Sequence, residues 1–147
     1  MRIIPIVAGL GLGLGLSLLG CQAESLSQVG TAPRQAITFA ATAHYPGNPT
    51  TSPTVHAAAV ADSSKDTLTI YNLGDTTIPA STLWVNGHFV RQIPAIAPRA
   101  SHQVTYNELI QAGPGVQTLK QLGQVVNTVE LQTAEGLFKV EGPATPS

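Results

Sequence analysis

The sequence predicts an all-β domain, a small antiparallel β-sandwich, and two observations carry this prediction. Short segments in which apolar and polar residues alternate recur between residues 55 and 142, which is the pattern of half-buried strands. Turn-forming residues separate these segments, and only one short helical turn interrupts them. The span is close to the roughly 100 residues that two packed sheets of this size require.

The first predicted hairpin covers residues 55–73. Residues 55–61 (VHAAAVA) form an apolar run, and the polar turn DSSKD follows it. In the next segment, Leu68 and Ile70 share one face while Thr67, Thr69 and Tyr71 share the other, which is strand periodicity. The pairing with this strand favours a strand over a helix for residues 55–61.

The strongest local signal lies in residues 82–93, where Asn86-Gly87 separates two β-rich runs. Asparagine and glycine adopt positive φ at low cost, so this pair suits a tight hairpin turn whose twist matches that of the strands. Residues 94–98 (PAIAP) cannot continue as a central strand, because proline donates no ladder hydrogen bond.

The remaining elements complete the predicted domain. Residues 101–106 form a further strand, and Asn107 caps a short helical turn (NELIQ). A last hairpin joins residues 127–133 to residues 136–142 through Ala134-Glu135. The tail, residues 143–147, is expected to be disordered.

In number of strands and in size, this arrangement resembles the immunoglobulin-like and fibronectin-like sandwiches, with Trp84 in the core. The resemblance concerns architecture alone, since no family motif occurs in residues 55–142.

The N-terminus carries a different kind of signal. Residues 3–19 contain no charged side chain, and the run ends in Leu18-Leu19-Gly20-Cys21, which holds the only cysteine of the chain. This segment resembles the lipobox of bacterial lipoproteins. The resemblance implies a signal peptide over residues 1–20, cleavage before Cys21, and a diacylglycerol on the Cys21 sulfur. Several acyl chains give stable attachment to a membrane, because each buried methylene contributes about 0.8 kcal/mol.

Two other interpretations of the N-terminus remain open: a plain signal peptide with an incidental cysteine, and an uncleaved membrane helix. All three place residues 22–147 outside the cytoplasm. Gln22, where an inner-membrane retention signal often has aspartate, favours the outer membrane or cell surface. Residues 21–54 are expected to be a flexible tether. Within it, Ile37 and Phe39 alternate with polar or small neighbours, so residues 36–45 are a candidate strand.

The composition excludes several classes of function. The net charge of −1 leaves no basic surface for nucleic acid. No nucleophile elbow, phosphate loop or paired carboxylates occur, so we expect no enzyme and no cofactor. No two histidines have metal-ligand spacing, so we expect no metal site. A histidine-metal enzyme would need His56, His88 and His102 to converge, and nothing in the sequence requires this.

These observations favour a non-enzymatic, lipid-anchored envelope protein whose β-sandwich acts as a structural or protein-interaction module. An exposed strand edge or the Asn86-Gly87 hairpin could dock that partner by strand addition. The alternative is a module that binds an envelope glycan or a small molecule. In that case Tyr71 and Trp84 would provide the stacking surface, which requires both rings to be exposed on one face.

Overall fold

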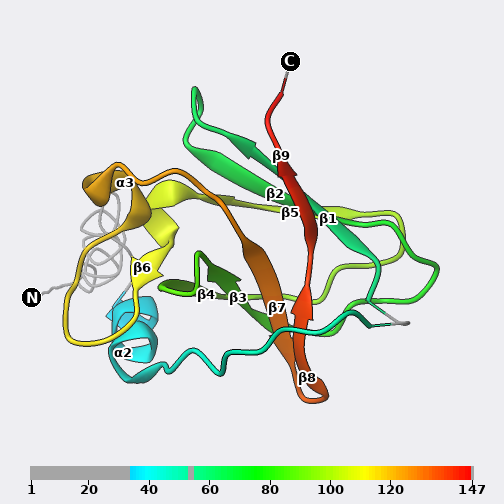
Figure 1. Ribbon diagram of the computed structural model, residues 1–147, viewed down its shortest axis with the longest axis horizontal. Coiled ribbons are helices and arrows are strands. Elements are labelled where there is room, and N and C mark those ends of the chain that lie inside the picture. Colours follow the sequence, from blue (N-terminus) through cyan, green and yellow to red (C-terminus); the bar gives the residue numbers. More distant parts are fainter. Residues whose placement is uncertain (1–33, 53–54, 147) are drawn as a thin grey trace, which may run out of the picture. The chain divides into compact units, whose positions relative to one another are not determined.

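The computed structural model describes residues 34–52 and 55–146. These residues form two sheets that face each other across a shared apolar core, as Figure 1 shows. Neighbouring strands are antiparallel except for β9 beside β1. The predicted all-β sandwich is therefore confirmed.

The first sheet, called sheet I, has the strand order β5-β2-β1-β9. Its members are β1 (Ala57–Asp62), β2 (Thr67–Asn72), β5 (Ser101–Thr105) and β9 (Glu141–Ala144). β1 and β2 pair over six residues each, from Ala57 with Asn72 to Asp62 with Thr67. This confirms the first predicted hairpin.

The second sheet, called sheet II, has the order β6-β4-β3-β7-β8. Its members are β3 (Ser81–Val85), β4 (Phe89–Ile93), β6 (Ile110–Gln111), β7 (Val129–Thr133) and β8 (Gly136–Lys139). The other two predicted hairpins are confirmed here, as β3–β4 and β7–β8. At the turn between β3 and β4, Asn86 has φ +55° and Gly87 has φ +67°, the left-handed values expected of this pair.

The order of strands is that of an immunoglobulin-like domain. β1, β2 and β5 take the places of strands A, B and E in one sheet. β8, β7, β3 and β4 take the places of strands G, F, C and C′ in the other. The short β6 adds to the C′ edge, and β9 continues the chain from β8 into sheet I.

The core between the sheets is made by alternate residues of the long strands. Leu68 and Ile70 of sheet I face Leu83 and Leu131 of sheet II, and each is fully buried. Burying one such aliphatic side chain stabilises the fold by about 1.5–3 kcal/mol. The alternation read from the sequence thus gives the inward face of both sheets.

The N-terminal part of the described chain departs from the prediction. Residues 36–45 do not form a strand, because α2 (Arg34–Thr42) is a helix. Its apolar residues Ala36, Ile37 and Ala40 follow a helical repeat and lie on the outer face of sheet II. Residues 34–52, called the strap here, are therefore ordered against the domain, and the expected flexible tether does not extend through them. Residues 21–33 and 53–54 lie outside the described part of the chain.

The helical turn predicted after residue 106 also differs from the structure in its position and length. η1 (Tyr106–Glu108) is a single 3₁₀ turn that begins after Thr105, not after Asn107. The chain then re-enters sheet II as β6 instead of continuing as a helix. A short helix that was not predicted, α3 (Leu119–Leu122), follows, and it is capped by Thr118 and Gln121 in a reciprocal box.

The C-terminal strand is divided between the sheets. The chain leaves sheet II after β8, passes through the buried Val140, and joins sheet I as β9, parallel to β1. Residues 143 and 144 are therefore part of a strand, and the prediction that the disordered tail begins at residue 143 is wrong for these two residues. Pro143 is tolerated because β9 lies at the edge of its sheet.

Gly142 permits this crossing, and we expect Gly142→Ala to be strongly destabilising. Gly142 has φ +97°, and an added Cβ would lie 2.7 Å from the carbonyl oxygen of Ala59. Backbone strain of about 1–3 kcal/mol and an overpacking cost of similar size should both lower the free energy of unfolding. Gly113→Ala is the matched control, because Gly113 has φ +106° and nothing within 4 Å. If urea unfolding shows that Gly142→Ala and Gly113→Ala lose equal free energy of unfolding, the close approach of residue 142 to the Ala59 carbonyl is contradicted.

Candidate functional site

The predicted lipidation site, Cys21, lies outside the described residues. Across residues 34–52 and 55–146, no helix is long and apolar enough to cross a membrane.

Tyr71 and Trp84 lie on opposite sides of the sandwich. Tyr71 is 41% exposed on the outer face of β2, whereas Trp84 is 1% exposed on β3. Trp84 points to the outer face of sheet II, where its indole N–H donates to Gln132 Oε1 at 2.8 Å. The expectation that these two rings form one stacking surface is therefore wrong, because the strap covers Trp84. Trp84 is buried as expected, but in a second apolar layer rather than between the sheets.

The three histidines of the metal hypothesis lie in separate elements. His56 precedes β1 at the end of the sandwich where β2 leads into β3. His88 lies in the β3–β4 turn at the opposite end, and His102 lies within β5. Among the described residues, no three histidine, cysteine or acidic side chains come together to hold a metal ion.

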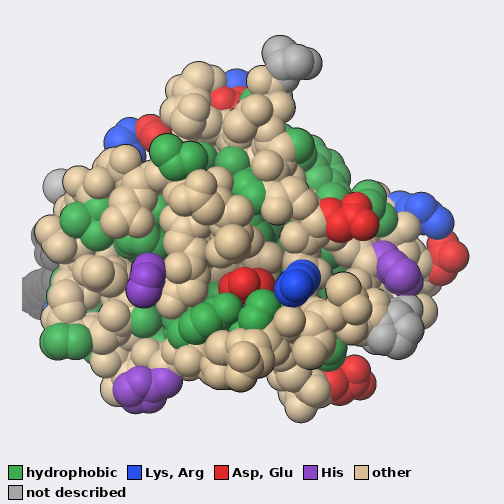
Figure 2. Space-filling model, in the orientation of Figure 1, with side chains coloured by type: hydrophobic (Ala, Val, Ile, Leu, Met, Phe, Trp, Pro, Cys, Tyr) green, Lys and Arg blue, Asp and Glu red, His purple; other side chains and the backbone are tan. Residues whose placement is uncertain are grey.

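On the face shown in Figure 2, the charged side chains of the described residues do not gather by sign. Figure 2 shows positive and negative groups side by side on the visible face. Several are direct ion pairs, such as Arg99 with Asp75 at 2.8 Å and Lys65 with Asp62 at 3.6 Å. Exposed pairs of this kind contribute little to stability.

One carboxylate, Glu130 on β7, is buried. The residue is only 6% exposed, and its Oε2 has no hydrogen-bond partner within the described part of the chain. It lies opposite Trp84 of β3 and opposite Lys139 of β8 in the ladder. A buried polar atom without a partner is costly, so this position calls for an explanation.

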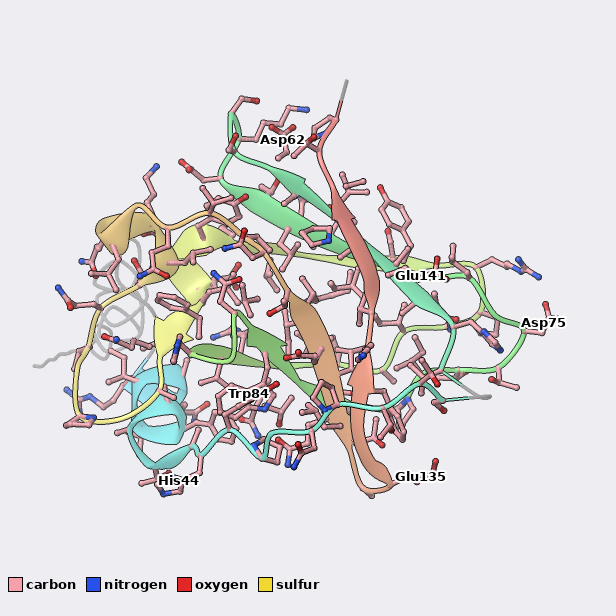
Figure 3. The ribbon with its side chains drawn as sticks, viewed as in Figure 1. His44, Asp62, Asp75, Trp84, Glu135 and Glu141 are labelled. Atoms are coloured by element: carbon pink, nitrogen blue, oxygen red, sulfur yellow. The ribbon has the colours of Figure 1, made fainter. Side chains whose placement is uncertain are left out.

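The strap is what buries Glu130. The side chain of Tyr45, which follows α2, lies close enough to the Glu130 carboxylate to lower its pKa, and its ring meets Trp84 edge-on at a centroid distance of 5.3 Å. The Tyr45 ring also lies over the β3–β4 turn, where a Cβ on Gly87 would be 3.4 Å away. Figure 3 shows Trp84 beside this part of the chain, whereas the exposed His44 points away from the sheet.

The environment changes the acidity of both partners. Burial raises the pKa of Glu130 above its ordinary value of 4.5, and the Tyr45 hydroxyl and Lys139 offset only part of this effect. Burial and the Glu130 charge together raise the pKa of Tyr45. Burial of Glu130 beneath the strap is therefore least costly when its carboxyl group is protonated.

A second feature is the edge of sheet I formed by β5. The Asn72 N–H donates to Ala100 O and the Tyr106 N–H donates to Asp66 O. These two bonds show which residues of β5 direct their backbone groups toward β2, because such residues alternate along an antiparallel ladder. The backbone groups of His102 and Val104 therefore face β2, and those of Ser101, Gln103 and Thr105 face outward. No charged residue and no proline lies in β5, although such residues commonly protect a free edge.

An ion pair closes the side of the sandwich next to this edge. Arg91 of β4 pairs with Leu83 in the ladder, so its side chain points between the sheets, where it lies 3.4 Å from Glu108. Glu108 also accepts the outward N–H of Thr105 at 2.7 Å. Consequently the outward backbone groups of Ser101 and Gln103 are the ones at which an extended partner could pair.

The Asn86-Gly87 hairpin is engaged within the domain. Asn86 Oδ1 accepts the N–H groups of Asn127 and Thr128, and its Nδ2 donates to Val125 O at 2.8 Å. Gly87 lies beneath Tyr45. The sequence predicted docking at an exposed strand edge or at this hairpin; the hairpin is occupied within the domain, whereas β5 presents an exposed edge.

Sequence reasoning missed Tyr45 and Glu130. Glu130 alternates with Val129 and Leu131, a local pattern that does not distinguish a buried carboxylate from a solvated one. The signal that was available is its neighbour Trp84, a large aromatic residue on the same outward face, which itself requires a cover.

Comparison of the chain with protein-family models, with curated proteins and with solved structures gave no match. The class of protein is therefore defined by the fold alone, as an immunoglobulin-like β-sandwich with an N-terminal strap. Any assignment of function rests on the geometry described above.

Glu130→Gln should increase stability at neutral pH. Because burial raises the pKa of Glu130 in the folded state, the folded protein binds this proton more tightly than the unfolded chain does. The resulting stabilisation is fully present below about pH 4.5 and is lost as the pH rises through the folded-state pKa. Glutamine has no proton to lose in this range, so the variant keeps this stabilisation. The free energy of unfolding of Glu130→Gln should therefore exceed that of the wild type by an amount that grows between about pH 4.5 and pH 7.

Urea unfolding over this pH range measures the effect. Glu135→Gln, at the exposed turn between β7 and β8, removes the same charge without burial and is the matched control. If the free energy of unfolding of Glu130→Gln changes with pH in parallel with that of the wild type, the pKa of Glu130 is not raised by folding and the prediction is contradicted.

Proposed function

We propose that this protein is a non-enzymatic, lipid-anchored component of the bacterial cell envelope, and that its sandwich binds an extended segment of an envelope protein. The observation that carries the proposal is the uncharged edge strand β5, which presents outward backbone groups at Ser101 and Gln103. An extended peptide can add to such an edge as a further strand.

The anchor in this proposal is supported by the sequence. The lipobox-like Leu18-Leu19-Gly20-Cys21 ends an apolar run, and twelve residues separate Cys21 from Arg34, the first described residue. At most about 3.6 Å per residue, such a linker reaches on the order of 40 Å. A domain on this linker would remain close to the membrane surface.

Strand addition is favoured over the alternative of glycan binding. Backbone pairing at β5 requires only an accessible edge, and Gln103 and Ser101 are both exposed. Glycan binding through the expected aromatic pair would require Trp84 to leave the apolar layer beneath the strap. Tyr71 alone offers one ring, which is a small platform for a sugar.

The lipid anchor can be tested with Cys21→Ala. Cells that express the wild-type chain should incorporate a labelled fatty acid into it, and the variant should lose essentially all of the label because the acceptor sulfur is gone. The processed form should also be absent from the variant. A label that persists in Cys21→Ala would refute the anchor.

The docking edge can be tested with Gln103→Pro. The outward N–H of Gln103 makes no bond to β2, so proline there removes a donor for the partner and leaves the β2–β5 ladder bonds in place. A photo-crosslinking residue at Ser101 should give a discrete adduct in cells, and Gln103→Pro should reduce it by about tenfold, which corresponds to about 1.4 kcal/mol.

Gln103→Ala is the matched control, because it removes the side chain and keeps the N–H. We expect it to preserve the adduct, and thermal unfolding should show that both variants are folded. Absence of an adduct in the wild type, or equal adducts in the two variants, would rule out backbone pairing at β5.

A further inference from the structure

The strap crosses the whole outer face of sheet II and is held at three places. At its start, Ala40 O accepts the Gly113 N–H at 2.9 Å, and α2 lies against β4 and β6. In its middle, Tyr45 contacts Trp84 and Glu130. At its end, Thr50 pairs with β8, where its N–H donates to Leu137 O and its carbonyl accepts the Lys139 N–H.

The middle contact differs from the other two because it contains an ionisable group. The flanking contacts are backbone hydrogen bonds and apolar packing, which do not change with pH. Beneath Tyr45, in contrast, the Glu130 carboxylate is 6% exposed and has one oxygen without a partner among the described residues. Lifting the strap would return this carboxylate to water, so its charge is penalised only while the strap is docked.

We propose that the strap is a proton-controlled latch, in which protonation of Glu130 favours the docked strap and ionisation favours its release from sheet II. Release exposes Trp84 and the apolar residues around it, and it frees the outer edge of β8. The proposal goes beyond partner binding at β5 and does not depend on it.

The charged and titratable groups around Glu130 set the direction of the effect. From the strap, the Tyr45 hydroxyl acts on the carboxylate, and from β8, Lys139 acts on it across the ladder. Both favour the ionised form, but burial outweighs them, so the pKa of Glu130 is raised in the docked state. Docking is therefore tightest below about pH 4.5 and weakens as the pH rises through the docked-state pKa.

Trp84 is a built-in reporter of this equilibrium, since it is the only tryptophan in the sequence and lies under the strap. We would measure acrylamide quenching of Trp84 in the full-length chain in detergent, at pH 4.5 and at about pH 7.5. As the undocked population grows, quenching of the wild type should rise about twofold or more. Glu130→Gln should stay weakly quenched at both pH values, and Glu135→Gln should behave as the wild type.

Hydrogen exchange separates a local latch from loss of the whole fold. Between the two pH values, protection factors should fall for the Lys139 and Gly113 N–H groups, which bond to the strap, and not for the Asn72 N–H in sheet I. Three results would overturn the proposal: quenching that is independent of pH, a wild-type response in Glu130→Gln, or equal loss of protection in both sheets.

Discussion

Sheet II is apolar on both of its faces, and the rest of the structure follows from this constraint. In β3, Leu83 and Val85 point toward sheet I, while Trp84 points the other way, and all three are fully buried. Sheet I can cover only the inner face. A strand buried on both faces needs a layer on each side, and the strap provides the second one. The helix α2, the partial burial of Tyr45 and the burial of Glu130 are consequences of that requirement.

The hairpins could be predicted because their information is local. Asn86-Gly87 specifies a turn by its own backbone preferences, and the residues of β1 and β2 alternate on either side of a polar turn. The division of residues 136–142 between two sheets could not be read in this way. It depends on the burial of Val140 in the core and on the pairing of β9 with β1, and both involve residues that are far apart in the sequence.

The helix α2 illustrates a different limit. In residues 34–42, Ile37 and Phe39 fit a two-residue alternation, and Ala36, Ile37 and Ala40 equally fit a helical repeat. The choice between them is made by the outer face of sheet II, which is too far along the chain to enter a local pattern. Glu130 was missed for the same reason, because an outward-facing carboxylate is solvated unless another layer covers it.

The two sheets differ in which edges and faces they leave open. In the described chain, sheet II is covered on its outer face by the strap and along β8 by Thr50. Sheet I keeps an open edge at β5 and an outer face of small and hydroxyl-bearing residues around Tyr71. The extended partner proposed above would therefore pair with sheet I. The strap, which precedes the sandwich in the sequence, lies on sheet II instead. The strap lies on sheet II and β5 lies at the edge of sheet I, so the binding proposed at β5 and the strap movement proposed above concern different sheets and can be tested separately.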